Sequence, residues 1–143
     1  MNHPLKTEAA KNIGLLALRL TLGATFLLAG CLKVLRIGVT DFVNSSSKFL
    51  PGFLPRPIGQ TYLYAVPFLE IMVGALLIAG LFTRFGAGIA TLMLISFSIA
   101  VTGIFINGNY FQVQPNMVYI AAAFLLATMG AGAISVDKAI FRK

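Results

Sequence analysis

Three charged side chains lie inside long apolar stretches of this sequence. Arg19 and Lys33 occur in LRLTLGATFLLAGCLKVL, and Glu70 occurs in PFLEIMVGALLIAGLFTR. An ionisable group inside a membrane span costs roughly 2.5–3.5 kcal/mol on insertion scales, so such a group needs a partner or a function. The chemistry open to these three groups is ion pairing, proton transfer or the binding of a polar headgroup.

Helical spacing places the two basic residues on one stripe. At about 100° per residue, the positions of Gly23, Phe26, Gly30 and Lys33 all fall within about 40° of Arg19. Small residues let helices approach closely in lipid, where no hydrophobic drive brings helices together. We therefore expect Gly23 and Gly30 to mark a helix contact.

The acidic residue shares its helix face with Pro67 and Gly74. Counting about 1.5 Å per residue through a core of about 30 Å places the backbones of Arg19 and Glu70 about 8 Å apart in height. We therefore predict a buried Arg19–Glu70 ion pair, with Gly74 at the contact between the two helices. By the same count Lys33 lies about 13 Å above Glu70, where it can extend toward the interface.

Such a pair has two possible roles. It can fix the register of two helices, or it can line a polar pocket for a headgroup, a proton or a quinone. The residues that we consider candidates for this pocket are Arg19, Glu70, Lys33, Tyr62 and Tyr119.

The composition indicates which elements position these groups. The chain has 143 residues, of which 58% are hydrophobic and 10% are charged, and Phe85 to Val136 holds no Asp, Glu, Lys or Arg. A soluble domain needs more polar surface than this. The sequence predicts an all-α polytopic membrane protein, a single domain over residues 1–143 that forms a four-transmembrane-helix bundle. The predicted spans cover about 13–35, 61–82, 85–106 and 116–135.

The segments between the spans are short except for the first. Residues 1–12 are interpreted as a polar tail, and residues 107–115 as a polar turn with Pro115 in the first turn of the next helix. In the 36–58 loop, Thr40 can cap a helix that the prolines at 51, 55 and 57 prevent from continuing. Its apolar face predicts an interfacial helix; that face holds Phe42, Val43, Ser46, Phe49 and Leu50.

Charge distribution predicts the orientation. With both termini in the cytoplasm, six basic residues lie inside and four outside or at the outer edge, which agrees with the positive-inside rule. The net charge of +7 is therefore assigned to orientation and anionic lipid headgroups. No basic stripe indicates nucleic-acid binding.

The single Cys and single His restrict the chemistry further. LLAGC at residues 27–31 resembles a lipoprotein cleavage site, but Arg19 lies inside the apolar region, where a signal peptide is uncharged. We therefore expect an uncut span with Cys31 as a small apolar residue. One Cys with His3 provides no disulfide, CxxC pair, metal site or bis-histidine haem within one chain, and no flavin or nucleophile motif is found.

The two quoted stretches and GAGAISVD at residues 130–137 resemble the DoxX family of small four-helix bacterial membrane proteins, with which DoxD-like and MauE-type proteins are grouped. The resemblance covers about residues 13–138 and implies a compact bundle with a long first loop. The family's charged positions match Arg19, Lys33, Glu70 and Arg84. DoxD-type relatives imply a quinone-linked oxidoreductase, and MauE-type relatives imply maturation of a dehydrogenase.

Two classes of function follow. The first is a subunit or accessory of a quinone-linked oxidoreductase in the bacterial inner membrane, which has no intrinsic cofactor, binds a quinone and receives electrons from a partner subunit. The alternative is a non-catalytic scaffold that binds a lipid, a partner or a second copy of itself. A small transporter is less favoured, because four helices without broken inverted repeats leave little room for alternating access.

Overall fold

The computed structural model describes residues 4–102 and 110–140, and all regular structure in these residues is helical. Helix α1 (Pro4–Leu32) continues into a π-helical turn (Lys33–Ile37), followed by α2 (Val39–Ser46) and a short 3-10 helix (Ser47–Phe49). The remaining helices are α3 (Arg56–Ala79), α4 (Thr83–Thr102), α5 (Tyr110–Met129) and α6 (Val136–Ile140).

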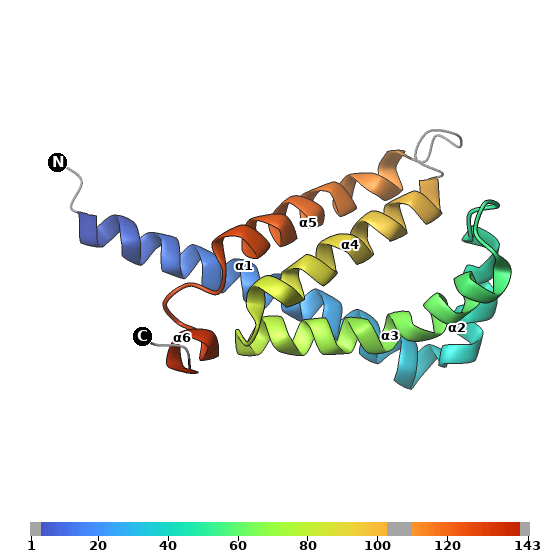
Figure 1. Cartoon of the computed structure of the whole chain (residues 1–143), viewed down its shortest axis with the longest axis horizontal. Coiled ribbons are helices and arrows are strands. Elements are labelled where there is room, and N and C mark those ends of the chain that lie inside the picture. Colours follow the sequence, from blue (N-terminus) through green and yellow to red (C-terminus); the bar gives the residue numbers. More distant parts are fainter. Residues whose placement is uncertain (1–3, 103–109, 141–143) are drawn as a thin grey trace.

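The four long helices run alternately in opposite directions (Figure 1). Helix α1 packs along α3, and α4 packs along α5; α3 with α4 and α1 with α5 make smaller contacts that close the arrangement. The first turns of α1 and the short helix α6 lie at one end, and α2 lies at the other (Figure 1). The two ends of the bundle are therefore built from different sets of side chains.

The predicted all-α membrane class is confirmed. Within the described residues, three helices are long and apolar enough to cross a membrane: Thr7–Ile37, Arg56–Ala79 and Thr83–Ala100. Pro115–Met129 is a shorter apolar helix, so the fourth span stays a prediction. The predicted end of the third span at residue 106 and residues 107–109 of the predicted turn lie outside the described residues. Residues 110–115 were also predicted to belong to this turn, but they form the start of α5.

Several predicted boundaries were wrong. Residues 4–12, expected to form a polar tail, are the start of α1, because Pro4 suits a first turn and the following residues favour helix. The second helix begins at Arg56, with Pro57 in its first turn, so this proline starts α3 as well as ending the loop. Pro115 lies within α5 and not in its first turn.

Glycines set the closest helix contact. A methyl group added to Gly74 would lie 2.5 Å from the Leu27 nitrogen and 2.7 Å from the Gly23 oxygen. One added to Gly30 would lie 2.6 Å from the Pro67 oxygen. The backbones of α1 and α3 therefore touch at three positions that were expected at a helix contact, and no larger residue fits there without moving a backbone.

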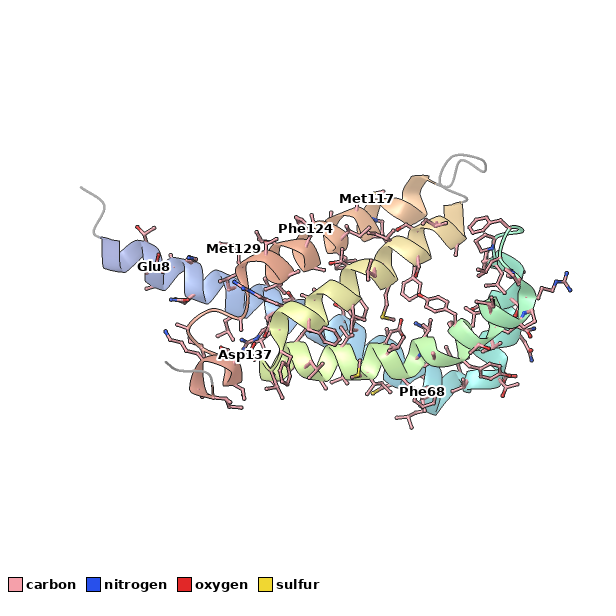
Figure 2. All side chains as sticks on the ribbon, viewed as in Figure 1. Glu8, Phe68, Met117, Phe124, Met129 and Asp137 are labelled. Atoms are coloured by element: carbon pink, nitrogen blue, oxygen red, sulfur yellow. The ribbon has the colours of Figure 1, made fainter. Side chains whose placement is uncertain are left out.

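Large apolar residues divide between the interior and the outer surface. Val66, Val73 and Leu77 on α3 and Leu126 on α5 are fully buried. Phe68 and Phe124 are 56% and 61% exposed and lie on outward faces of α3 and α5 (Figure 2). Since exposed phenylalanines of this kind are favourable in hydrocarbon, the outer surface suits a lipid environment.

The tight turn between α3 and α4 is held by the C-terminal segment. Gly80 has φ 69° and Phe82 has φ 47°, and the Phe82 and Thr83 amides donate to the two Asp137 carboxylate oxygens at 2.7 and 2.9 Å. The Asp137 amide donates in return to the Gly80 carbonyl at 2.9 Å. Asp137 thus caps the N-terminus of α4 from α6 (Figure 2), where a negative charge is favourable.

Gly74→Ala tests the helix contact. We expect it to lower the free energy of unfolding by about 1–3 kcal/mol, because the added methyl must displace backbone. Gly88→Ala is the matched control, since nothing lies within 4 Å of a methyl group at this position in α4. Thermal unfolding in detergent measures both variants, and equal stability of the two would contradict the contact.

Asp137→Ala tests the cap. We expect it to destabilise the fold by about 1–2 kcal/mol, because two amide donors at the start of α4 lose their acceptor. Asp41→Ala provides the control, since Asp41 is exposed at the start of the short helix α2. Chemical unfolding curves of the two variants should differ, and loss of stability in Asp41→Ala alone would overturn the assignment.

Candidate functional site

The buried acid of α3 pairs with the lysine near the end of α1. Lys33 Nζ lies 2.5 Å from Glu70 Oε1, and the side chains are 20% and 3% exposed. Lys33 occupies the first position of the π-helical turn. The predicted Arg19–Glu70 pair is therefore corrected to a Lys33–Glu70 pair.

Helix register explains why Lys33 replaces Arg19 as the partner of Glu70. Gly30 contacts both Pro67 and Ile71, which brings Glu70 about level with residue 29. From there Lys33 is about 6 Å away along the axis and Arg19 about 15 Å. Moreover, side chains lean toward the N-terminus of their own helix. In this antiparallel pair Lys33 and Glu70 lean toward each other, whereas Arg19 leans away.

Arg19 instead serves the opposite end of the bundle. It is 3% exposed, and its Nη1 donates a hydrogen bond to the Ala131 carbonyl at 3.1 Å. A methyl group added to Gly80 would lie within 2.7 Å of the guanidinium carbon, so the guanidinium lies against the α3–α4 turn. Arg19 therefore ties α1 to the α3–α4 turn and to the segment after α5.

Asn12 adds a second tie at this end. Its Oδ1 accepts a hydrogen bond of 2.9 Å from the Ala133 amide. Gly130 and Gly132, which precede and follow Ala131, have φ of 82° and 76°, a conformation that glycine adopts without steric cost. The chain can therefore reverse direction immediately after α5, and its backbone at Ala131 and Ala133 then contacts Arg19 and Asn12.

A cavity of about 590 Å³ lies at the other end, between α2, the following loop, α3 and α4. Lys33 lines it, with its ammonium 5.1 Å from the ring centre of Phe42 and 5.8 Å from that of Phe97. Phe49, Leu50 and other apolar residues line much of the remainder. A cation fixed by a buried carboxylate thus faces an otherwise largely apolar cavity, and the two rings add favourable cation–π contact.

A second polar group in the cavity comes from Tyr62 and Ser96. Their hydroxyl oxygens lie 2.5 Å apart, and both residues line the cavity. The Ser96 hydroxyl donates to the Met93 carbonyl at 2.7 Å. Since a serine has one hydroxyl proton, Tyr62 is the donor in the shared bond, and its oxygen keeps acceptor capacity.

The structure separates the predicted pocket residues. Lys33 and Tyr62 line the cavity. Glu70 binds Lys33 but is not among the lining residues, and Arg19 lies at the other end of the bundle. Tyr119 is 38% exposed on α5 and is not among the residues that line the cavity.

Sequence reasoning missed two polar or aromatic contributors, Ser96 and Phe97. They lie in the uncharged 85–106 stretch, where a hydroxyl group has little effect on hydropathy. Phe42 and Phe49 were expected on the apolar face of the loop helix, and the structure directs both to the cavity. No sequence signal identifies Ser96, because its contact with Tyr62 depends on how α4 packs against α3.

The arrangement suits binding of an amphipathic molecule. Lys33 offers further N–H donors beyond the one bonded to Glu70, and Tyr62 offers an acceptor. Within the described residues, no cluster of His, Cys, Asp and Glu side chains could hold a metal ion.

A double-mutant cycle tests the Lys33–Glu70 pair. Lys33→Met should lower the free energy of unfolding by about 3 kcal/mol, because it leaves a buried carboxylate unpaired. Adding Glu70→Gln should recover more than half of that loss. Lys48→Met, at an exposed position, should change stability by less than about 0.5 kcal/mol. Additive losses in the double variant, measured by thermal unfolding, would show that the two groups do not interact.

The comparison with known proteins agrees with this architecture. A family model described as DoxX matches residues 14–103, which is more than half of the chain and includes Arg19, Lys33 and Glu70. No curated protein and no solved structure matches the chain. Its apolar helices and this match together show that the chain is a membrane protein that belongs to the DoxX family.

Proposed function

We propose that this protein is a membrane subunit or accessory of a quinone-linked oxidoreductase and that the cavity between α2, α3 and α4 binds the quinone. The observation that carries the proposal is a single fixed cation, Lys33, in a cavity whose lining is otherwise largely apolar. A quinone has the matching chemistry, with carbonyl acceptors on a ring and an apolar tail.

The shape of the site supports a ligand drawn from the membrane. The cavity volume of about 590 Å³ lies within the usual range for small-molecule sites. A surface groove of about 450 Å³ on α3 shares Ile58 and Tyr62 with the cavity. A headgroup in the cavity could therefore continue into a tail that lies in this groove.

Polar groups on two sides can orient the headgroup. Lys33 can donate to one carbonyl oxygen, while Glu70 holds the ammonium in place. The Tyr62 oxygen, whose own proton is donated to Ser96, can accept a hydrogen bond from a hydroxyl group of the reduced ligand. Two electrons and two protons convert a quinone to its hydroquinone.

This chain's contribution to such a reaction is binding and orientation. The sequence carries no metal, haem or flavin motif, so the proposal assigns electron delivery to a partner oxidoreductase subunit. Lys33, Tyr62 and Ser96 would fix the headgroup, and the aromatic lining would limit water around it.

The proposal includes a location and a topology. We infer a protein of the bacterial cytoplasmic membrane with four spans, the fourth formed around the apolar helix Pro115–Met129, and both termini in the cytoplasm. The first turns of α1 and helix α6 lie at the same end (Figure 1), as this topology requires. Helix α2, proposed as interfacial, would then place the cavity near the outer face.

Quinone binding to the purified full-length chain tests the function. A short-tail ubiquinone should raise the unfolding temperature of the wild type. Tyr62→Phe should weaken binding about three- to tenfold through loss of a hydrogen-bonding group. Tyr64→Phe is the matched control, since Tyr64 is 45% exposed on the same helix and is not among the cavity-lining residues.

Two outcomes would overturn the proposal. The first is no stabilisation by a ubiquinone or a menaquinone analogue. The second is equal stabilisation by an alkyl chain without a quinone ring, unaffected by Tyr62→Phe. That result would favour the alternative of a non-catalytic lipid-binding scaffold that uses the same cavity.

A further inference from the structure

A second hollow lies at the opposite end of the bundle from the proposed quinone cavity. It has a volume of about 330 Å³ and lies where α4 begins, α5 ends and α6 folds back. Two of the residues that line it, Arg84 and Lys138, are basic. The Arg84 side chain lies across Gly130, where an added methyl group would be 3.2 Å from the arginine Nε. The left-handed Gly130 therefore makes room for the arginine.

These two cations are not neutralised by the protein residues that the structure describes. In that part of the chain, the ion pairs are Glu8–Lys11 and Lys33–Glu70, and neither includes Arg84 or Lys138. Both basic residues are exposed. The hollow therefore presents two positive charges to an external anion.

The one acid in the hollow has its charge directed elsewhere. Asp137 lines the hollow, but its two oxygens accept from the Phe82 and Thr83 amides. Its carboxylate thus offsets the positive end of α4. An anion in the hollow would meet Arg84 and Lys138 beside the polar backbone around Gly130–Gly132.

The hollow lies at the boundary of the apolar helices. The candidate span Thr83–Ala100 begins beside it, and the apolar helix Pro115–Met129 ends beside it. Met129 lines the hollow and is 43% exposed, and Phe85, which follows Arg84 in the chain, is 66% exposed. Groups at this level meet lipid headgroups, while the neighbouring apolar side chains meet acyl chains.

We propose that this hollow is a binding site for the phosphate headgroup of an anionic phospholipid, held by Arg84 and Lys138. Arginine matches a phosphodiester with two parallel N–H donors, and lysine adds a second charge. Basic pockets between spans at the membrane surface are suited to such headgroups. A lipid is favoured over a soluble phosphate because the hollow adjoins the apolar surface that acyl chains would cover.

Native mass spectrometry of the full chain with phosphatidylglycerol or phosphatidylcholine tests the proposal. The wild type should retain phosphatidylglycerol in preference. Arg84→Gln should weaken its retention about fivefold, and Arg84→Gln with Lys138→Gln should weaken it on the order of twentyfold or more. Arg84→Lys keeps the charge and should bind within about twofold of the wild type, so that it differs clearly from Arg84→Gln.

The control removes two charges from the other end of the bundle. Arg36→Gln with Arg56→Gln, at exposed positions, should leave phosphatidylglycerol retention unchanged. An equal loss in this control, or no preference for phosphatidylglycerol over phosphatidylcholine, would overturn the site. Competition by soluble glycerol phosphate at the same concentration as the lipid would overturn the assignment to a lipid.

Discussion

The backbone contact between α1 and α3 is the constraint on which the rest of the molecule depends. Gly23, Gly30 and Gly74 leave no room for a side chain between the two helices, so one register is favoured over its neighbours. This register decides which charges meet. It brings Lys33 to Glu70 and sends Arg19 to the far end, although all three groups lie on the same two helices.

The two ends of the bundle then differ in construction. At the α3–α4 turn, Arg19, Asn12 and Asp137 bind backbone groups of distant segments, and polar side chains hold the helices together. At the other end, α3 and α4 diverge, and α2 lies beside the start of α3 (Figure 1). A cavity forms where the helices diverge, and Lys33 supplies its charge.

Buried charge therefore has two separate roles in this chain. Arg19 satisfies the buried carbonyl of Ala131 in the segment after α5, and a carbonyl of this kind would be costly to leave unpaired away from water. The Lys33–Glu70 pair keeps a cation at the wall of an apolar cavity, where a lone lysine would be strongly disfavoured. The first role is structural, and the second provides the chemistry on which the proposed quinone site relies.

The membrane class, the all-helical fold, the approximate positions of three spans and the glycines that meet between α1 and α3 can all be predicted from the order of residues alone. Hydropathy and helical spacing are local properties, and local properties are readable along the chain. They also identified Arg19, Lys33 and Glu70 as residues that need partners. Their partners depend on how the helices pack. Counting from predicted helix ends misplaced the register of two antiparallel helices and ignored the lean of side chains toward each N-terminus. Ser96, Phe97 and Asp137 acquire their roles from contacts with residues 34 to 64 positions away in the chain, and no local pattern encodes a contact at that distance.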